Sequence, residues 1–414
     1  MEYITTVQAA EKWNISDRRI RTLCKEGKIP GVVVKGNRYR IPADAQKPAD
    51  GRVKHFEAYK YLKWDNDVIG LIDEQFNVKF VNPQYNDVVC LYTQGTAEWP
   101  REKFISFLSE RIVSPDRRDI ERILFRCGLS TYDVLKIAVI TKGIHPKDLL
   151  WMADTQAEKF ISAVTDVFES IFIKKKDLQG DSVNSPEGYN IKRYGVFNGR
   201  YGIYKQRISP LNTDVESEIA VYKLAERMGI PCCPAYPVDK NTMFSEFVYD
   251  FAQEYIVHFR RLFDGARSDN EYHNLVNIRP QYKEDIIKML ILDFVTRQDD
   301  RHLSNMAVRI SKDGESFYPL YDNGRSLFYE DTPEMVQQAC EDVKLYATSF
   351  GYSGTYYDYL LDISKEGIDL KSLVNLDITD NEIHNILLES GFKSYRLEGA
   401  RIWIRKAIEI IKQL

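Results

Sequence analysis

The segment "DDRHLSN" at residues 299–305 decides the fold of the longer part of this chain. It separates an apolar run at 286–295, typical of a buried helix, from an apolar run at 306–310, typical of a strand. Polar side chains concentrated between two core elements are typical of a functional loop. A second polar cluster, "YDNG" at residues 321–324, follows the apolar run at 317–320. The sequence therefore predicts two functional loops that are close together along the chain.

Phosphoryl transfer by kinases requires such a pair of loops. One aspartate accepts the proton of the attacking hydroxyl, while an asparagine a few residues on and an aspartate of the next loop hold magnesium against the phosphates. The order of residues predicts Asp300 as the base and Asn305 and Asp322 as the metal ligands. Arg301 and His302 are expected to have structural roles in the first loop. Each residue alone also has an ordinary structural interpretation, and the order of the whole set favours the kinase.

The upstream sequence contains a lysine and a glutamate in the order that a kinase needs. Lys205 ends the apolar part of a predicted strand at 200–206, and Glu218 is expected to open a helix that continues through 219–225. An ion pair between the two would position the lysine on ATP. The other predicted ATP contacts are Glu246, Phe247 and Val248, in a hinge reached by a strand at 243–248, and Gly188, in a polar stretch at 180–189 that could cover the phosphates.

At these motifs the sequence resembles the HipA-like kinases of bacterial toxin–antitoxin systems. The resemblance covers roughly residues 55–414 and is strongest over 180–330. It implies a two-lobed fold, ATP and Mg²⁺ as cofactors, transfer to serine or threonine, and autophosphorylation of a serine in the phosphate loop, which would be Ser182 or Ser185. The sequence departs from the family at Gln298, where an asparagine is common, and in the low glycine content of 180–189.

Residues 1–48 predict a small winged helix-turn-helix domain. A helix at 7–13, with Thr6 as its cap, precedes a turn and a second helix at 17–26 that Ser16 caps. Strands near 32–34 and 38–41 then form a hairpin. This part resembles the DNA-binding heads of excisionase and MerR-type proteins.

Charge is concentrated in this head. Residues 11–40 carry nine Lys and Arg against three acids, although the whole chain has a net charge of −4. Basic residues on both the second helix and the hairpin favour binding to a nucleic acid. A small docking domain with solvated arginines is the alternative. The predicted DNA contacts are Arg18, Arg19, Arg21 and Lys25 in the helix, and Lys35, Arg38 and Arg40 in the hairpin.

Length and composition limit the remaining possibilities. A chain of 414 residues exceeds the usual size of one domain. We expect an α+β protein with the head at 1–48, a linker at 49–54, an N-terminal kinase lobe with a family-specific insertion at 55–250 and a mainly helical C-terminal lobe at 251–414. No apolar run approaches the ~20 residues of a membrane span, and the N-terminus does not resemble a secretory leader. Scattered cysteines without CxxC pairs favour a cytoplasmic protein.

Three functions compete for this sequence. The first is an ATP- and Mg²⁺-dependent protein kinase fused to a DNA-binding domain, with a toxin–antitoxin or autoregulatory role and a possible homodimer. The second is a transcription regulator whose kinase-like body only binds nucleotide; the presence of Lys205, Asp300, Asn305 and Asp322 argues against it. The third is a kinase for a small alcohol, which would need a deep and closed acceptor pocket.

Overall fold

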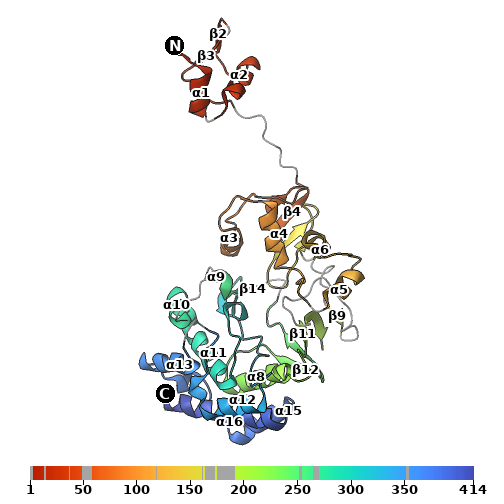
Figure 1. Ribbon diagram of the computed structural model, residues 1–414, viewed down its shortest axis with the longest axis vertical. Coiled ribbons are helices and arrows are strands. Elements are labelled where there is room, and N and C mark those ends of the chain that lie inside the picture. Colours follow the sequence, from red (N-terminus) through yellow and green to blue (C-terminus); the bar gives the residue numbers. More distant parts are fainter. Residues whose placement is uncertain are drawn as a thin grey trace. The chain divides into compact units, whose positions relative to one another are not determined.

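The computed structural model describes residues 3–13, 15–36, 38–48, 58–117, 119–160, 162–163, 173–174, 192–250, 254–263, 270–350 and 354–414. The chain divides into two compact units, Met1–Glu57 and Ala58–Leu414. Each unit is visible in Figure 1. The expected linker at 49–54 lies outside the described residues, as do Ser182, Ser185 and Gly188. The boundary between lobes at residue 250 stays a prediction.

The first unit has the predicted helix-turn-helix with a hairpin. Its elements are β1 (Tyr3–Ile4), α1 (Thr6–Trp13), α2 (Asp17–Lys25), β2 (Val33–Lys35) and β3 (Arg38–Pro42), and the strands pair in the order β1-β3-β2. Ser16 caps α2 as expected, since its side chain accepts a hydrogen bond from the N–H of Arg19 at 3.3 Å. The prediction for α1 was wrong by one residue: Thr6 lies inside the helix, and the hydroxyl of Thr5 accepts from the N–H of Gln8.

The second unit begins with a five-stranded antiparallel sheet in the order β7-β6-β5-β4-β8. Its strands are β4 (Lys60–Trp64), β5 (Asp67–Ile72), β6 (Val78–Phe80), β7 (Glu98–Trp99) and β8 (Leu150–Ala153). The helices in this region are α3 (Asp87–Thr93), α4 (Arg101–Ser109), α5 (Ile120–Arg126) and α6 (Val134–Thr141). A buried aromatic cluster formed by Trp99, Phe104 and Phe107 packs α4 against the edge strand β7.

A second five-stranded sheet, in the order β12-β13-β11-β10-β9, positions the predicted lysine. Its strands are β9 (Ile173–Lys174), β10 (Lys192–Phe197), β11 (Arg200–Gln206), β12 (Ala235–Asp239) and β13 (Thr242–Glu246). Asn198 and Gly199, both with positive φ, join β10 to β11, as a two-residue hairpin turn requires. Helix α8 (Asp214–Met228) contacts β12 and β13. Glu218 therefore lies in the second turn of α8 and does not open the helix, because the helix begins at Asp214.

The rest of the second unit is mainly helical, as predicted, with one small sheet in the order β14-β15-β16. Helix α11 lies at its centre, and its apolar side chains from Ile286 to Val295 are almost fully buried. The elements are β14 (Tyr255–His258), α9 (Phe259–Leu262), α10 (Glu271–Ile278), η2 (Pro280–Tyr282), α11 (Lys283–Thr296), η3 (Leu303–Asn305), β15 (Ala307–Ser311), β16 (Gly314–Phe317), α12 (Pro333–Glu341), η4 (Val343–Leu345), α13 (Tyr356–Lys365), α14 (Leu370–Leu373), α15 (Asp380–Glu389) and α16 (Ser394–Gln413).

The fold is thus mixed α and β, with a helix-turn-helix head and a second unit whose later part is mainly helical, as the sequence predicted. Among the described residues, no helix is both long enough and apolar enough to cross a membrane.

Candidate active site

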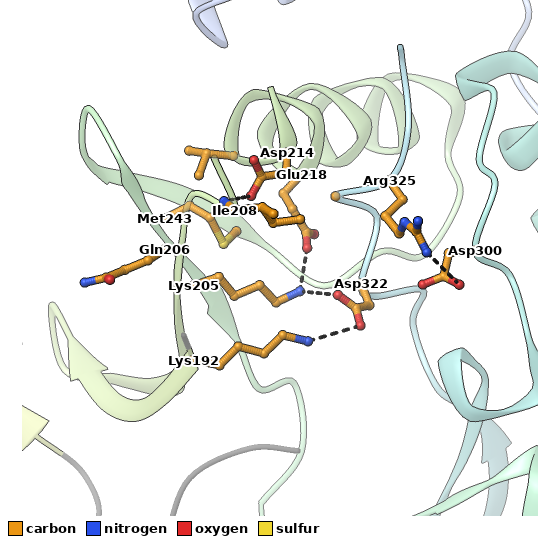
Figure 2. A pocket seen from close by; sticks show the side chains of 12 residues that line it. Lys192, Lys205, Gln206, Ile208, Asp214, Glu218, Met243, Asp300, Asp322 and Arg325 are labelled. Carbon is orange, nitrogen blue, oxygen red and sulfur yellow. Dashed lines mark hydrogen bonds and ion pairs between the residues drawn. The ribbon is translucent and has the colours of Figure 1, made fainter. Parts of the chain in front are cut away.

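Lys205 is at the centre of a cluster of opposite charges. Its Nζ lies 2.5 Å from Oε1 of Glu218 and 2.9 Å from Oδ1 of Asp322 (Figure 2). The side chains of Lys205 and Glu218 are 13% and 6% exposed, so this ion pair is largely shielded from solvent. Burial opposes the charge on Lys205, but Asp322 and Glu218 outweigh it and raise the pKa of the ammonium group. Lys205 therefore carries a fixed positive charge.

The loop that carries Asp322 is held against α8. Asp322 has a φ of +59°, a left-handed conformation that Asp tolerates better than most residues. The next N–H, from Asn323, donates to Oε2 of Glu218 at 3.1 Å. Although burial favours the neutral acid, Lys192 and Lys205 hold the pKa of Asp322 well below its usual range. Asp322 is therefore ionised at any physiological pH.

Arg301 organises the two loops around one buried guanidinium group. It forms a two-pronged ion pair with Asp293 of α11 at 2.9 and 3.0 Å. It also donates to the carbonyl oxygens of Asn305 and Tyr321 at 3.0 Å and to Oδ1 of Asn323 at 2.7 Å. Because the side chain is fully buried, loss of these bonds would leave several polar groups without partners. Arg301 thus joins helix α11 and both loops through one side chain.

His302 contributes to the shape of the first loop. Its Nδ1 accepts a hydrogen bond from the N–H of Ser304 at 3.2 Å, and this contact caps the short helix η3. Its Nε2 lies 3.8 Å from Oδ1 of Asp300. The side chain of Asp300 is 30% exposed, so a substrate hydroxyl could reach it.

Gln298 links the two predicted functional loops. Its Oε1 accepts from the N–H of Asp300 at 3.1 Å, and its Nε2 donates to the carbonyl oxygen of Asp322 at 3.3 Å. Both ends of its amide group thus take part in the connection between the loops.

The two predicted metal ligands offer oxygen atoms of the kind that magnesium prefers. The amide of Asn305 donates from Nδ2 to the carbonyl oxygen of Asp300 at 2.8 Å, which uses one of its two N–H groups and leaves its oxygen to act as an acceptor. Asp322 supplies a carboxylate. A hard carboxylate and a hard amide oxygen fit Mg²⁺, which commonly takes its remaining ligands from phosphates and water. Within the described ranges no cluster of three or more His, Cys, Asp or Glu side chains is suited to a metal.

One pocket is lined by residues of the second five-stranded sheet, of helix α8 and of the two predicted functional loops (Figure 2). Asp300 and Asp322 line it together with Lys205 and Glu218. Asn305 does not line it, and its contact with this site runs through the backbone of Asp300. The other lining residues are Lys192, Gln206, Ile208, Asp214, Val215, Met243, Gly324 and Arg325.

The predicted hinge at 246–248 does not line this pocket. The N–H groups of Glu246 and Phe247 donate to the carbonyl oxygens of Pro234 and Tyr201, both at 2.9 Å. The N–H of Val248 donates to the hydroxyl of Tyr318 at 3.3 Å. These bonds occupy the backbone donors that a hinge would offer to adenine, so the assignment of ATP contacts at 246–248 stays a prediction.

Lys192 and Arg325 are pocket residues that sequence reasoning missed. Lys192 lies directly opposite Lys205 in the β10–β11 register, and its Nζ is 3.5 Å from Oδ2 of Asp322. The Asn-Gly pair at 198–199 is the signal that could have revealed this, because it marks a hairpin and opposed residues in a hairpin share a face. Arg325 follows Asp322 by three residues, and no local pattern distinguishes it from a solvated arginine.

The head has a second groove, formed by α2 and the hairpin. It is lined by Asp17, Arg18, Arg21, Thr22, Lys25 and Tyr39. Arg21 pairs with Asp17 at 2.9 Å and remains mostly exposed. Of the predicted DNA contacts, Arg18, Arg21, Lys25, Lys35 and Arg38 are exposed, whereas Arg19 and Arg40 are partly buried.

Residues 3–45 match the sequence family described as helix-turn-helix domain. The head is a helix-turn-helix domain. No curated protein matches this sequence.

Two solved structures are similar to the chain. One is a Helicobacter pylori proinflammatory kinase, CtkA, with 17% identity, a TM-score of 0.46, and coverage of 55% of this chain and 92% of that one. The other is HipA from a Shewanella oneidensis toxin–antitoxin complex with HipB and operator DNA, with 12% identity, a TM-score of 0.49, and coverage of 86% and 97%. At these identities, the chemistry has to be judged from the side chains of this chain.

Proposed function

We propose that the second unit is an ATP- and Mg²⁺-dependent kinase that phosphorylates serine or threonine in a protein, and that the head binds DNA. One observation carries the proposal: Lys205, Glu218, Asp300 and Asp322 come from separate elements and line one pocket in the arrangement that phosphoryl transfer needs.

Each residue of this chain has a defined task in the proposed reaction. Glu218 orients Lys205, which contacts the phosphates of the nucleotide, and Lys192 adds a second positive charge from the adjacent strand. Asp300 accepts the proton of the acceptor hydroxyl. Magnesium, held by Asp322 and Asn305, would neutralise charge on the phosphates.

A protein acceptor fits this site better than a small alcohol does. The side chains of Asp300, Asp322 and Arg325 are 30%, 32% and 46% exposed. A kinase for a small metabolite commonly encloses its acceptor to exclude water. The openness around Asp300 leaves room for a chain segment that carries the hydroxyl group. Autophosphorylation of Ser182 or Ser185 belongs to this proposal.

The fusion to a helix-turn-helix domain suggests autoregulation. A chain that binds its own promoter and also phosphorylates targets would combine the two activities in one cytoplasmic protein, with homodimerisation as a possible arrangement. The alternative head function, docking to another protein, predicts no salt-dependent binding to DNA.

The decisive experiment incubates the purified protein with ATP labelled at the γ-phosphate, with and without Mg²⁺. We expect metal-dependent incorporation of label into protein, and mapping of the sites by mass spectrometry identifies the acceptor. Asp300→Ala should reduce the rate by at least about 10²-fold while ATP still binds. Asp313→Ala, in an exposed turn, is the matched control. Transfer by Asp300→Ala within a few-fold of the wild-type rate would show that Asp300 is not the base.

A further inference from the structure

Arg325 has a guanidinium group that is anchored at one end and open at the other. Its Nε donates to the hydroxyl of Tyr329 at 2.9 Å, and the guanidinium carbon lies 5.4 Å from the centre of that ring. Among the described residues, its two terminal nitrogens donate no hydrogen bond. The side chain is 46% exposed and lines the pocket. A planar fork with a fixed Nε and free terminal N–H groups is suited to bind an oxyanion.

Arg325 lies beside the proposed base, Asp300. Its Nη1 lies 3.6 Å from Oδ1 of Asp300, and its Nε lies 3.6 Å from Oδ1 of Asp299. These distances allow attraction but exceed a hydrogen bond, so the guanidinium is held near the proposed base without being saturated by it. In Figure 2, Lys192 and Lys205 reach Asp322 from one side, and Arg325 with Asp300 lies on the other.

The backbone fixes this relation between the two loops. The carbonyl oxygen of Arg325 accepts a hydrogen bond from the N–H of Asp299 at 3.1 Å. Arg325 also follows the proposed metal ligand Asp322 by three residues on the same loop. Because its backbone is bonded to one loop and belongs to the other, Arg325 is held next to the space between Asp322 and Asp300.

We propose that Arg325 is a catalytic residue that contacts the phosphoryl group during its transfer. The inference rests on the proposed kinase function. In the reaction, the acceptor oxygen forms a bond to the γ-phosphorus and its proton passes to Asp300. The bond from that phosphorus to the β,γ-bridging oxygen breaks, and ADP leaves with the electron pair. The equatorial oxygens of the transferring phosphoryl group carry negative charge. Arg325 stabilises this charge from the acceptor side, and Lys192 and Lys205 stabilise it from the nucleotide side.

Arg325→Ala tests the proposal under single-turnover conditions, with Mg²⁺ and with the protein in excess over ATP labelled at the γ-phosphate and above the dissociation constant of ATP. Transfer to protein and transfer to water are both measured, so no identified substrate is needed. We expect the rate of transfer to fall about 10²–10³-fold. The dissociation constant of ATP should change by less than about threefold, because the residue acts mainly in the transition state. Free guanidinium ion at millimolar concentration should restore part of the rate in Arg325→Ala.

Two further measurements separate catalysis from folding. The wild-type protein should bind ADP with Mg²⁺ and aluminium fluoride more tightly than ADP with Mg²⁺ alone, and Arg325→Ala should lose that difference. Arg325→Lys, which keeps the charge, should retain more activity than Arg325→Ala. Arg405→Ala is the matched control, since Arg405 on α16 is 48% exposed and its Nε lies 3.9 Å from one glutamate, Glu409.

The outcomes distinguish this inference from the proposal that it rests on. A wild-type protein that transfers no phosphate overturns both. An active wild type with Arg325→Ala within threefold of its rate overturns only the role of Arg325. A slower Arg325→Ala that still binds the fluoride complex more tightly than ADP, and is not rescued by guanidinium, shows that Arg325 only supports the structure and also overturns it.

Discussion

At the scale of single residues, the site depends on charges that neutralise one another across distant parts of the chain. Asp322 faces Lys205 at 2.9 Å and Lys192 at 3.5 Å, so the proposed metal ligand is paired with two cations. A bound nucleotide would offer these lysines phosphate oxygens instead. Asp322 would then be available to the cation that accompanies the nucleotide.

The metal ligands should differ in their importance. Asp322→Ala should remove most of the thermal stabilisation that ATP gives in the presence of Mg²⁺, and Asn305→Ala should remove less. The reason is that a carboxylate neutralises the metal charge whereas an amide only coordinates it. Thermal unfolding with ATP and either Mg²⁺ or EDTA measures this, with Asp313→Ala as the control. An undiminished shift in Asp322→Ala would rule out the proposed metal site.

Asp214 should make the stability of the protein depend on pH. Burial raises the pKa of this carboxyl to about 6, although the N–H of Ile208 donates to it at 3.1 Å. The folded state therefore holds the proton more tightly than the unfolded state, and stability is lost as the pH rises from about 4 to about 6. A shift of two pKa units corresponds to about 3 kcal/mol.

Comparison of the wild type with Asp214→Asn isolates this effect. The free energy of unfolding of the wild type, relative to the variant, should fall between pH 4 and pH 7 by up to about 3 kcal/mol. Urea unfolding at several pH values measures the difference, and other titrating groups cancel between the two proteins. A difference that is constant over this range would contradict the raised pKa.

At the scale of elements, short helices and hairpins present the functional side chains. The N-cap of α2 fixes the start of the helix, so Arg18, Arg21 and Lys25 lie on one exposed face. The β10–β11 hairpin places Lys192 beside Lys205. In both cases a single helix or strand of fewer than ten residues sets the direction of a charged side chain.

The face of α2 should control binding to DNA. The double variant Arg18→Ala with Arg21→Ala should weaken binding and reduce the slope of log affinity against log salt by about 2, because each lost phosphate contact contributes about 0.9 to the slope. Titration of labelled duplex DNA at several salt concentrations measures both quantities. Lys28→Ala, just beyond α2, is the control. If wild-type binding does not depend on salt, the head is a docking module instead.

At the scale of the whole molecule, the hydrophobic core of the head is separate from the hydrophobic clusters of the second unit. The core of the head contains Ala9, Trp13, Ile20 and Leu23, and none of its members belongs to the core of the second unit. We therefore expect substitutions on the surface of one unit to leave the core of the other unit unchanged. The two activities should be separable by mutation.

This independence can be tested by measuring each variant in the assay for the other unit's activity. Asp300→Ala should bind DNA with the wild-type affinity and salt dependence. The Arg18→Ala, Arg21→Ala protein should transfer phosphate at the wild-type rate in the absence of DNA. Binding and transfer are measured on the same preparations. A change of more than about threefold in either crossed assay would mean that the units are coupled.

The sequence by itself determined the features that neighbouring residues encode. The head followed from helix periodicity, the cap at Ser16 and the turn before the hairpin. Polar clusters between apolar runs predicted the two loops that meet at the pocket. It failed where small energetic differences decide a boundary, as at the start of α8, which begins at Asp214 and leaves Glu218 in the second turn.

Only the tertiary structure decided how distant segments meet. Arg325 has no local pattern that sets it apart, and the Asn-Gly turn at 198–199 marks Lys192 only indirectly. Both became candidates because strand pairing and the loop bonds bring them to the same pocket as Asp322. The hydrogen bonds made by the backbone of Glu246, Phe247 and Val248 could not be predicted from the sequence either, since their partners lie on other strands and loops. Hydrogen bonds and charge pairs between segments far apart in sequence form only when burial of the apolar faces brings those segments together.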